Sequence, residues 1–315
     1  MREFIRRWTL AISMMAGASS YFILSWLPLG GGMRRWLLQG VGVVQPVLIF
    51  LMLFLTFCRV NPSQMRLCRW QMWNLLLQAG MFALLCLVLV LFPLTPLRPV
   101  IEGALLCFIC PTATAAVVVT SKLGGRAGTT TAYTLLINLG VAILVPLLVP
   151  LAHPQAGMGF AHAFSMILSK VFPLLLCPIV AAELLRRLSP GLTGRLASFR
   201  DLPFHLWAVA LALALAVTTR SLVTSHVSLA LAGGIALASL LACIIQFAVG
   251  RQAGRKYGDP ISGAQSCGQK NTVFAIWMGY TFLTPVTALA GGFYSIWHNV
   301  YNSWQLAQMR KRNCQ

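Results

Sequence analysis

Long stretches without a charged side chain dominate this sequence and decide its class. No Asp, Glu, Lys or Arg occurs between Arg69 and Arg98, or between Arg126 and Lys170. About 20 consecutive apolar residues are enough for an α-helix to cross the hydrocarbon core of a bilayer. Because 58% of the 315 residues are hydrophobic and only 9% are charged, the chain has too few charges to cover a water-soluble surface. We therefore predict an all-α polytopic membrane protein.

The apolar stretches divide into ten candidate transmembrane helices when the chain is read in windows of about 19 residues. The expected spans are residues 8–27, 36–58, 72–92, 99–123, 128–150, 164–185, 204–222, 227–249, 262–283 and 286–306. Two spans are irregular. The fourth contains Pro111, and the ninth begins with a run of small and polar residues.

The basic residues are distributed as this topology requires. Ten spans place both termini on one side, where 18 of the 24 Lys and Arg residues fall; four fall on the other side, and Lys170 and Lys270 lie inside spans. Positively charged loops stay in the cytoplasm, so we predict cytoplasmic termini and the inner (plasma) membrane of a bacterium. The net charge of +19 then reflects orientation and contact with membrane lipids, and we expect no nucleic-acid partner.

The ten spans form two halves of five, residues 1–155 and 156–315. An odd number of spans gives the two halves opposite orientations, as in secondary transporters built from inverted repeats. The interrupted fourth span then corresponds to the ninth. Paired broken helices bring free backbone groups and helix ends to the middle of the membrane, so they predict a binding site there.

The residues of the two interruptions are the candidates for that site. Pro111 cannot donate a backbone amide and so favours a break, although an ordinary proline-kinked helix is the alternative. In the ninth span the alternative is a cytoplasmic loop from which a lysine reaches outward to the surface. The candidate residues are Thr112, Thr114, Gly268, Gln269, Lys270 and Asn271.

Three motifs together resemble the bile acid:sodium symporter family of secondary transporters. They are CPTA at 110–113, GQKN at 268–271 and FYSIWHN at 293–299. The resemblance covers nearly the whole chain and implies ten helices in an inverted five-plus-five repeat, with discontinuous helices 4 and 9 that cross. It also implies a panel domain from helices 1, 2, 6 and 7 and a core domain from helices 3–5 and 8–10, with substrate held between them.

The departures from the family change the expected ion coupling. Sodium-coupled members have a glutamate and a glutamine where this chain has Ser266 and Lys270, and sodium-binding side chains where it has Ala116 and Val117. The polar side chains that remain at sodium-ligand positions are Gln78 and Asn138. Because sodium takes about five or six oxygen ligands, the resemblance implies that neither site is intact. We expect no cofactor and no bound metal.

Lys270 offers a replacement for the bound cation. Its ammonium would supply the positive charge from the protein itself, and near a half-helix N-terminus it would help to hold an anionic substrate. A Lys270 that releases and regains a proton would instead couple transport to protons, and both versions stay open. We expect a secondary active transporter of a small organic anion that works by alternating access without sodium.

Several other polar residues have a structural and a functional interpretation. We expect His298 to bond a neighbouring helix, with the substrate cavity as the alternative, so it joins Gln78 and Asn138 as a weaker site candidate. Lys170 is expected to reach the outer surface, with the cavity as the alternative. Glu102 and Glu183 are expected to be structural, the latter paired with arginines at i+3 and i+4.

Other functions stay open beside the sodium-independent carrier. A sodium-coupled symporter would assemble its site from Gln78, Asn138, Gln265 and backbone carbonyls. A transport-inactive receptor would bind ligand without flux, and arsenite extrusion would use Cys110 as a thiolate ligand. Enzymatic activity is not expected, because the sequence has no phosphate-binding glycine loop, HExxH motif or nucleophile elbow.

Overall fold

The computed structural model describes residues 2–28, 30–60, 65–154, 157–199, 201–224 and 227–313, which form thirteen α-helices. The boundary expected between the halves, at residues 155 and 156, lies outside the described residues. The helices are α1 (Arg2–Trp26), α2 (Gly31–Arg59), α3 (Arg69–Leu91), α4 (Arg98–Ile109), α5 (Ala115–Lys122), α6 (Ala127–Ala152), α7 (Phe160–Leu188), α8 (Pro190–Ser198), α9 (Leu202–Thr224), α10 (Leu229–Lys256), α11 (Pro260–Gly268), α12 (Thr272–Phe282) and α13 (Leu289–Asn313).

Six of the helices are long and apolar enough to cross a membrane. These segments are Gln39–Arg59, Arg69–Leu91, Ala127–Ala152, Phe160–Leu188, Leu202–Thr224 and Leu229–Lys256. Their outer faces are also apolar, since α3 leaves Leu76, Leu84 and Leu87 exposed along its length. Contiguous exposed apolar surface of this kind faces lipid in a membrane protein. The prediction of an all-helical membrane protein is confirmed.

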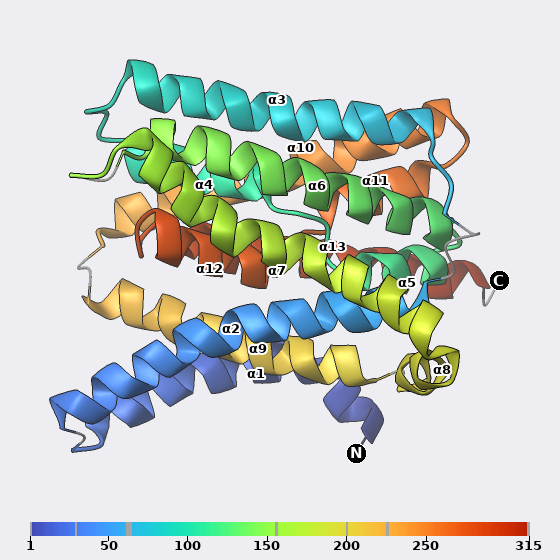
Figure 1. Ribbon diagram of the computed structural model, residues 1–315, viewed down its shortest axis with the longest axis horizontal. Coiled ribbons are helices and arrows are strands. Elements are labelled where there is room, and N and C mark those ends of the chain that lie inside the picture. Colours follow the sequence, from blue (N-terminus) through green and yellow to red (C-terminus); the bar gives the residue numbers. More distant parts are fainter. Residues whose placement is uncertain are drawn as a thin grey trace.

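Four shorter helices form two broken pairs, of which α4, α11 and α12 are mostly buried and α5 is partly exposed. Helix α4 ends at Ile109 and α5 begins at Ala115, while α11 ends at Gly268 and α12 begins at Thr272. None of the four exceeds 12 residues, so none crosses a bilayer alone. Figure 1 shows them between α3 at one edge of the molecule and α1, α2 and α9 at the other.

The long helices pack into two groups around these short ones. Helix α1 packs on α9, and α2 packs on α7 and α9. On the other side α10 runs along α11 so closely that a Cβ added to Gly250 would lie 2.5 Å from the carbonyl oxygen of Gly263. The glycines therefore allow the two backbones to touch, which fixes α11 against a full-length helix. The start of α1 and the end of α13 lie at the same end of the bundle (Figure 1).

Helix α8 and its surroundings tie α7 to α2. The sequence predicts a loop after residue 185. The chain instead stays helical to Leu188 and forms α8 directly afterwards. The expected pairs of Glu183 are present: Arg187 Nε donates to its Oε1 at 2.8 Å, and Arg186 donates to its Oε2. Arg186 also donates to the Phe57 and Val60 carbonyls at 2.7 and 2.9 Å, which anchors the end of α2.

Candidate functional site

The two interruptions meet and pair through their backbones. The amide of Ala113 donates to the Gln269 carbonyl and the amide of Asn271 donates to the Pro111 carbonyl, both at 2.9 Å. These bonds frame an antiparallel bridge between Thr112 and Lys270. We call residues 110–114 and 269–271 the helix crossing. Pro111 has no amide to continue α4, so its carbonyl is satisfied across the crossing.

Side chains hold the helix crossing in place. Thr112 Oγ1 donates to the Ser266 carbonyl at 2.6 Å, and the Cys110 thiol donates to the Asn271 carbonyl at 2.8 Å. The Tyr294 hydroxyl donates to the Gly268 carbonyl at 2.8 Å. A Cβ added to Gly268 would collide with the ring of Phe247, so this glycine serves close packing. The exposed backbone of both breaks is thus largely satisfied within the protein.

Lys270 is buried at the centre of this arrangement, with an exposed fraction of 1%. Its Nζ donates to the Phe108 carbonyl at 3.2 Å, which belongs to the last turn of α4. Residue 270 itself lies two positions before the start of α12, as expected near a half-helix N-terminus, whereas its ammonium lies at the C-terminal end of α4. Partial negative charge collects there, so the position suits a cation and does not suit an anion.

The surroundings of Lys270 contain thiols and no carboxylate. Four cysteines lie close enough to interact electrostatically with it: Cys107, Cys110, Cys243 and Cys267. Among the described residues, no Asp or Glu lies within ion-pair distance of its Nζ. The positive charge of Lys270 therefore has a carbonyl partner but no counter-charge in the part of the chain that the structure describes.

The other candidates at the crossing have local structural contacts. His298 is buried and its Nδ1 accepts from the Lys270 amide at 3.3 Å, so it bonds the crossing as the preferred interpretation expects. Asn271 caps α12, because its Oδ1 accepts from the Phe274 amide at 3.2 Å. Gln269 is buried with its Oε1 unpartnered, and Thr114 begins α5 without a side-chain cap bond.

Gln78 and Asn138 are buried on α3 and α6. Gln78 Nε2 donates to the Cys267 sulfur at 3.4 Å, which connects it to α11; its side chain also lies near the Tyr133 hydroxyl, and its Oε1 accepts no hydrogen bond within the described residues. Both amide atoms of Asn138 are buried without a hydrogen bond within the described residues. Unpartnered buried amides carry a free-energy cost, so these two side chains have capacity for a ligand that the protein itself does not use.

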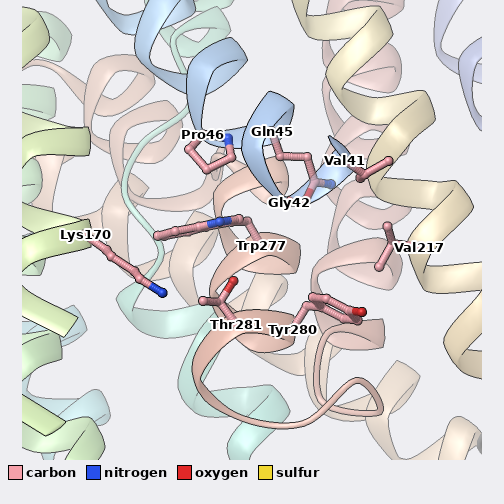
Figure 2. Close-up of a pocket in the computed structure, with 9 residues that line it drawn as sticks. All are labelled: Val41, Gly42, Gln45, Pro46, Lys170, Val217, Trp277, Tyr280 and Thr281. Atoms are coloured by element: carbon pink, nitrogen blue, oxygen red, sulfur yellow. The ribbon is translucent and has the colours of Figure 1, made fainter. Parts of the chain in front are cut away.

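A cleft opens where α12 faces α2, α7 and α9, and no residue of the helix crossing lines it. It has a volume of about 560 Å³ and is lined by Val41, Gly42, Gln45, Pro46, Lys170, Val217, Trp277, Tyr280 and Thr281. Figure 2 shows these side chains converging from α2, α7, α9 and α12. Lys170 is exposed and also lines the cleft, so the expected reach to the outer surface and its alternative, the cavity, both stay predictions.

None of the site residues predicted from the sequence lines this cleft. Four further lining residues, Gln45, Trp277, Tyr280 and Thr281, are not among the residues predicted from the sequence, and Lys170 was expected there only as the alternative. A signal was present for two of them, since Gln45 and Lys170 are polar residues inside apolar spans. The aromatic residues carry no such signal, because aromatic side chains are ordinary in membrane helices.

No family model matches the chain, and no curated protein matches its sequence. The resemblance to the bile acid:sodium symporter family therefore depends on the motifs alone.

Proposed function

We propose that the chain is a secondary active transporter of a small organic anion, of the bile acid:sodium symporter type. In this proposal the ten spans are α1, α2, α3, α4 with α5, α6, α7, α9, α10, α11 with α12, and α13. The first five spans and the last five are inverted repeats. Helix α8 then lies at the cytoplasmic surface, together with both termini.

The packing of the helices supports a division into panel and core. The proposed panel contains α1, α2, α7 and α9, in which α1 packs on α9 and α2 packs on both α7 and α9, while α7 also packs on α6 of the proposed core. The proposed core contains the remaining spans, and α10 contacts α4, α11 and α13 within it. The cleft lies where α12 of the core faces α2, α7 and α9 of the panel. A rocking motion between the two units would open this cleft to alternate sides of the membrane.

The observation that carries the proposal is the helix crossing with Lys270 buried in it. Two breaks at equivalent places in the two halves pair with each other, and the pairing holds a lysine ammonium against the end of α4. Broken helices with free ends near the membrane centre are typical of ion and substrate sites in transporters. A water-soluble helix bundle does not require such a break.

Lys270 takes the place of a transported cation in this proposal. The carbonyl end of α4 attracts positive charge, and the ammonium supplies it without an ion from solution. The favourable charge is then permanent, so transport requires no sodium. In the proton-coupled version, Lys270 releases and regains a proton during the cycle, and its side chain is a neutral amine in one of the two orientations of the transporter.

Flux into vesicles tests the proposal. The purified protein is reconstituted into sodium-free proteoliposomes and offered methanesulfonate, 2-naphthalenesulfonate and taurocholate, which stay charged and cross lipid slowly. We expect saturable uptake of at least one of them above that of protein-free vesicles, and we expect Lys270→Ala to abolish it. Folded protein that carries none of the three anions would contradict the proposal and would favour a transport-inactive binding protein.

A sodium-coupled symporter is the second candidate, and one observation favours it. Gln78, Asn138 and Gln265 each have a buried amide oxygen without a partner. Oxygen atoms of this kind are what a hard cation requires. Uptake that depends on sodium and is lost in Asn138→Leu would select this function over the sodium-independent one.

A further inference from the structure

The cleft has the dimensions of a site for a small organic molecule. Its volume of about 560 Å³ falls within the range of about 300–1,000 Å³ that is usual for such sites. Its lining comes from α2, α7 and α9 on one side and from α12 on the other. A molecule bound there would therefore contact both groups of helices at once.

Lys170 is the only charged side chain among the described residues that line the cleft. Its Nζ lies 5.7 Å from the centroid of the Phe282 ring, within the distance of a cation–π contact. No carboxylate among the described residues lies within ion-pair distance of it. Figure 2 shows its ammonium directed across the cleft toward Thr281. Lys170 is exposed in the cleft, where an anion would stabilise its ammonium, and the described residues provide none.

Gln45 adds a second polar group to the same cleft. The side chain is 2% exposed, and its Nε2 has no hydrogen-bond partner within the described residues. A buried amide without a partner is a destabilising feature that a bound oxygen atom would relieve. Gln45 and Lys170 come from different helices, so they provide two separate donors for one ligand.

The remaining lining is aromatic and apolar. Figure 2 shows the indole of Trp277 between Lys170 and Gln45, with Tyr280 beside Thr281. Val41 and Val217 complete the apolar wall. Aromatic faces of this kind favour a flat ring over a flexible polar chain, because stacked rings gain contact area with a defined geometry.

We infer that the cleft binds a flat aromatic monoanion, with Lys170 holding its charged group, Gln45 donating to the same group or to a neighbouring oxygen, and Trp277 stacking on its ring. The inference rests on the proposed transport function and names the substrate class of that function. It also separates the roles of the two intramembrane lysines. Lys170 contacts the substrate, whereas Lys270 bonds Phe108 inside the core and does not line the cleft.

Binding of 2-naphthalenesulfonate to the full-length protein in lipid nanodiscs tests this inference by calorimetry. The probe is a permanently charged flat anion, and 2-naphthalenesulfonamide is its neutral counterpart. We expect the wild type to bind the sulfonate at least about tenfold more tightly than the sulfonamide. We expect Lys170→Met to weaken sulfonate binding about tenfold to hundredfold, and Lys170→Arg to preserve most of it.

A matched control uses a lysine outside the cleft. Lys256→Met, at the exposed end of α10, should leave sulfonate binding unchanged. Gln45→Leu should weaken it by a smaller factor than Lys170→Met. Each variant is first shown to melt at the temperature of the wild type without ligand, so that lost binding is not lost folding.

The outcomes separate this inference from the proposed function. The inference is overturned if Lys170→Met binds the sulfonate as the wild type does, if the neutral probe binds equally well, or if the wild type binds neither. Sodium-free uptake of another anion that survives Lys170→Met would retain the transporter and reject this site. Lysine-dependent binding with no uptake into proteoliposomes would retain the site and reject transport.

Discussion

Two buried charges, Glu102 and Lys270, are equally shielded from solvent but differ in what surrounds them. Both side chains are about 1% exposed. Glu102 accepts from Arg98 Nε at 3.0 Å, from His153 Nδ1 at 2.8 Å and from Thr287 Oγ1 at 2.9 Å. Lys270 Nζ has the Phe108 carbonyl at 3.2 Å and no carboxylate among the described residues.

Under the proposed function, the difference separates a structural charge, Glu102, from a functional one, Lys270. Glu102 is neutralised by its own chain, and its partners tie α4 to the end of α6 and to the segment between α12 and α13. A fully partnered group of this kind stabilises one arrangement of helices. Within the described residues Lys270 has no carboxylate partner, and under the proposed function its ammonium acts in the transport cycle without a fixed counter-charge.

The largest effect on stability is expected for Glu102→Ala. The substitution leaves Arg98 and His153 without their shared acceptor and removes the acceptor of Thr287 Oγ1, which keeps only its bond to Thr284 Oγ1. Breaking a buried ion pair by removing one partner lowers the free energy of unfolding by about 3–5 kcal/mol. Chemical unfolding of the detergent-solubilised variant measures the loss. A loss below about 1 kcal/mol would show that the Glu102 network does not hold these helices together.

A smaller loss is expected for Thr112→Val, which tests how firmly the helix crossing is held. The variant loses the bond from Thr112 Oγ1 to the Ser266 carbonyl and leaves that carbonyl unpaired. We expect the free energy of unfolding to fall by about 1–2 kcal/mol. Thr114→Val is the matched control, because Thr114 has no side-chain cap bond, and it should stay within about 0.5 kcal/mol. Equal losses in both variants would contradict the role given to Thr112.

Lys270→Met is expected to abolish transport while changing the free energy of unfolding little. Replacing a buried charge with an apolar side chain of similar length alters the free energy of unfolding by about 1 kcal/mol or less, and in either direction. Uptake into proteoliposomes should nevertheless fall to the level of protein-free vesicles. If Lys270→Met unfolds as easily as Glu102→Ala, then Lys270 is structural and the contrast between the two charges disappears.

The smallest effect is expected for Glu183→Gln. The Glu183 side chain is 39% exposed, and Arg186 retains the Phe57 and Val60 carbonyls as acceptors when the carboxylate is lost. Exposed ion pairs contribute little because water solvates their charges well. We expect no measurable change in melting temperature, and a change as large as that of Thr112→Val would mean that the ends of α2 and α7 depend on this pair.

Local sequence signals were sufficient to predict the membrane class and the positions of the breaks. Uncharged stretches predicted long helices, and the break around Pro111 follows from the missing amide of proline. The polar run before α12 predicted the second break, where Asn271 acts as a helix cap. These features depend on residues that are close in sequence.

The cleft and the direction of Lys270 could not be predicted in the same way. Lys270 precedes α12 in sequence, yet its ammonium contacts α4, because the crossing of the two breaks brings that helix end beside it. The lining of the cleft combines residues from four helices that only tertiary packing brings together. Lys170 therefore faces a cavity that no spacing along α7 indicates.

The central claim is that Lys270 supplies the positive charge that sodium would otherwise bring. The most direct measurement is the melting temperature of the purified wild type as sodium replaces potassium at constant ionic strength, since a ligand that binds only the folded state raises this temperature. We predict the same melting temperature in both salts. A saturable rise that only sodium produces would contradict the claim and would assign a sodium site to the unpartnered amides of Gln78 and Asn138.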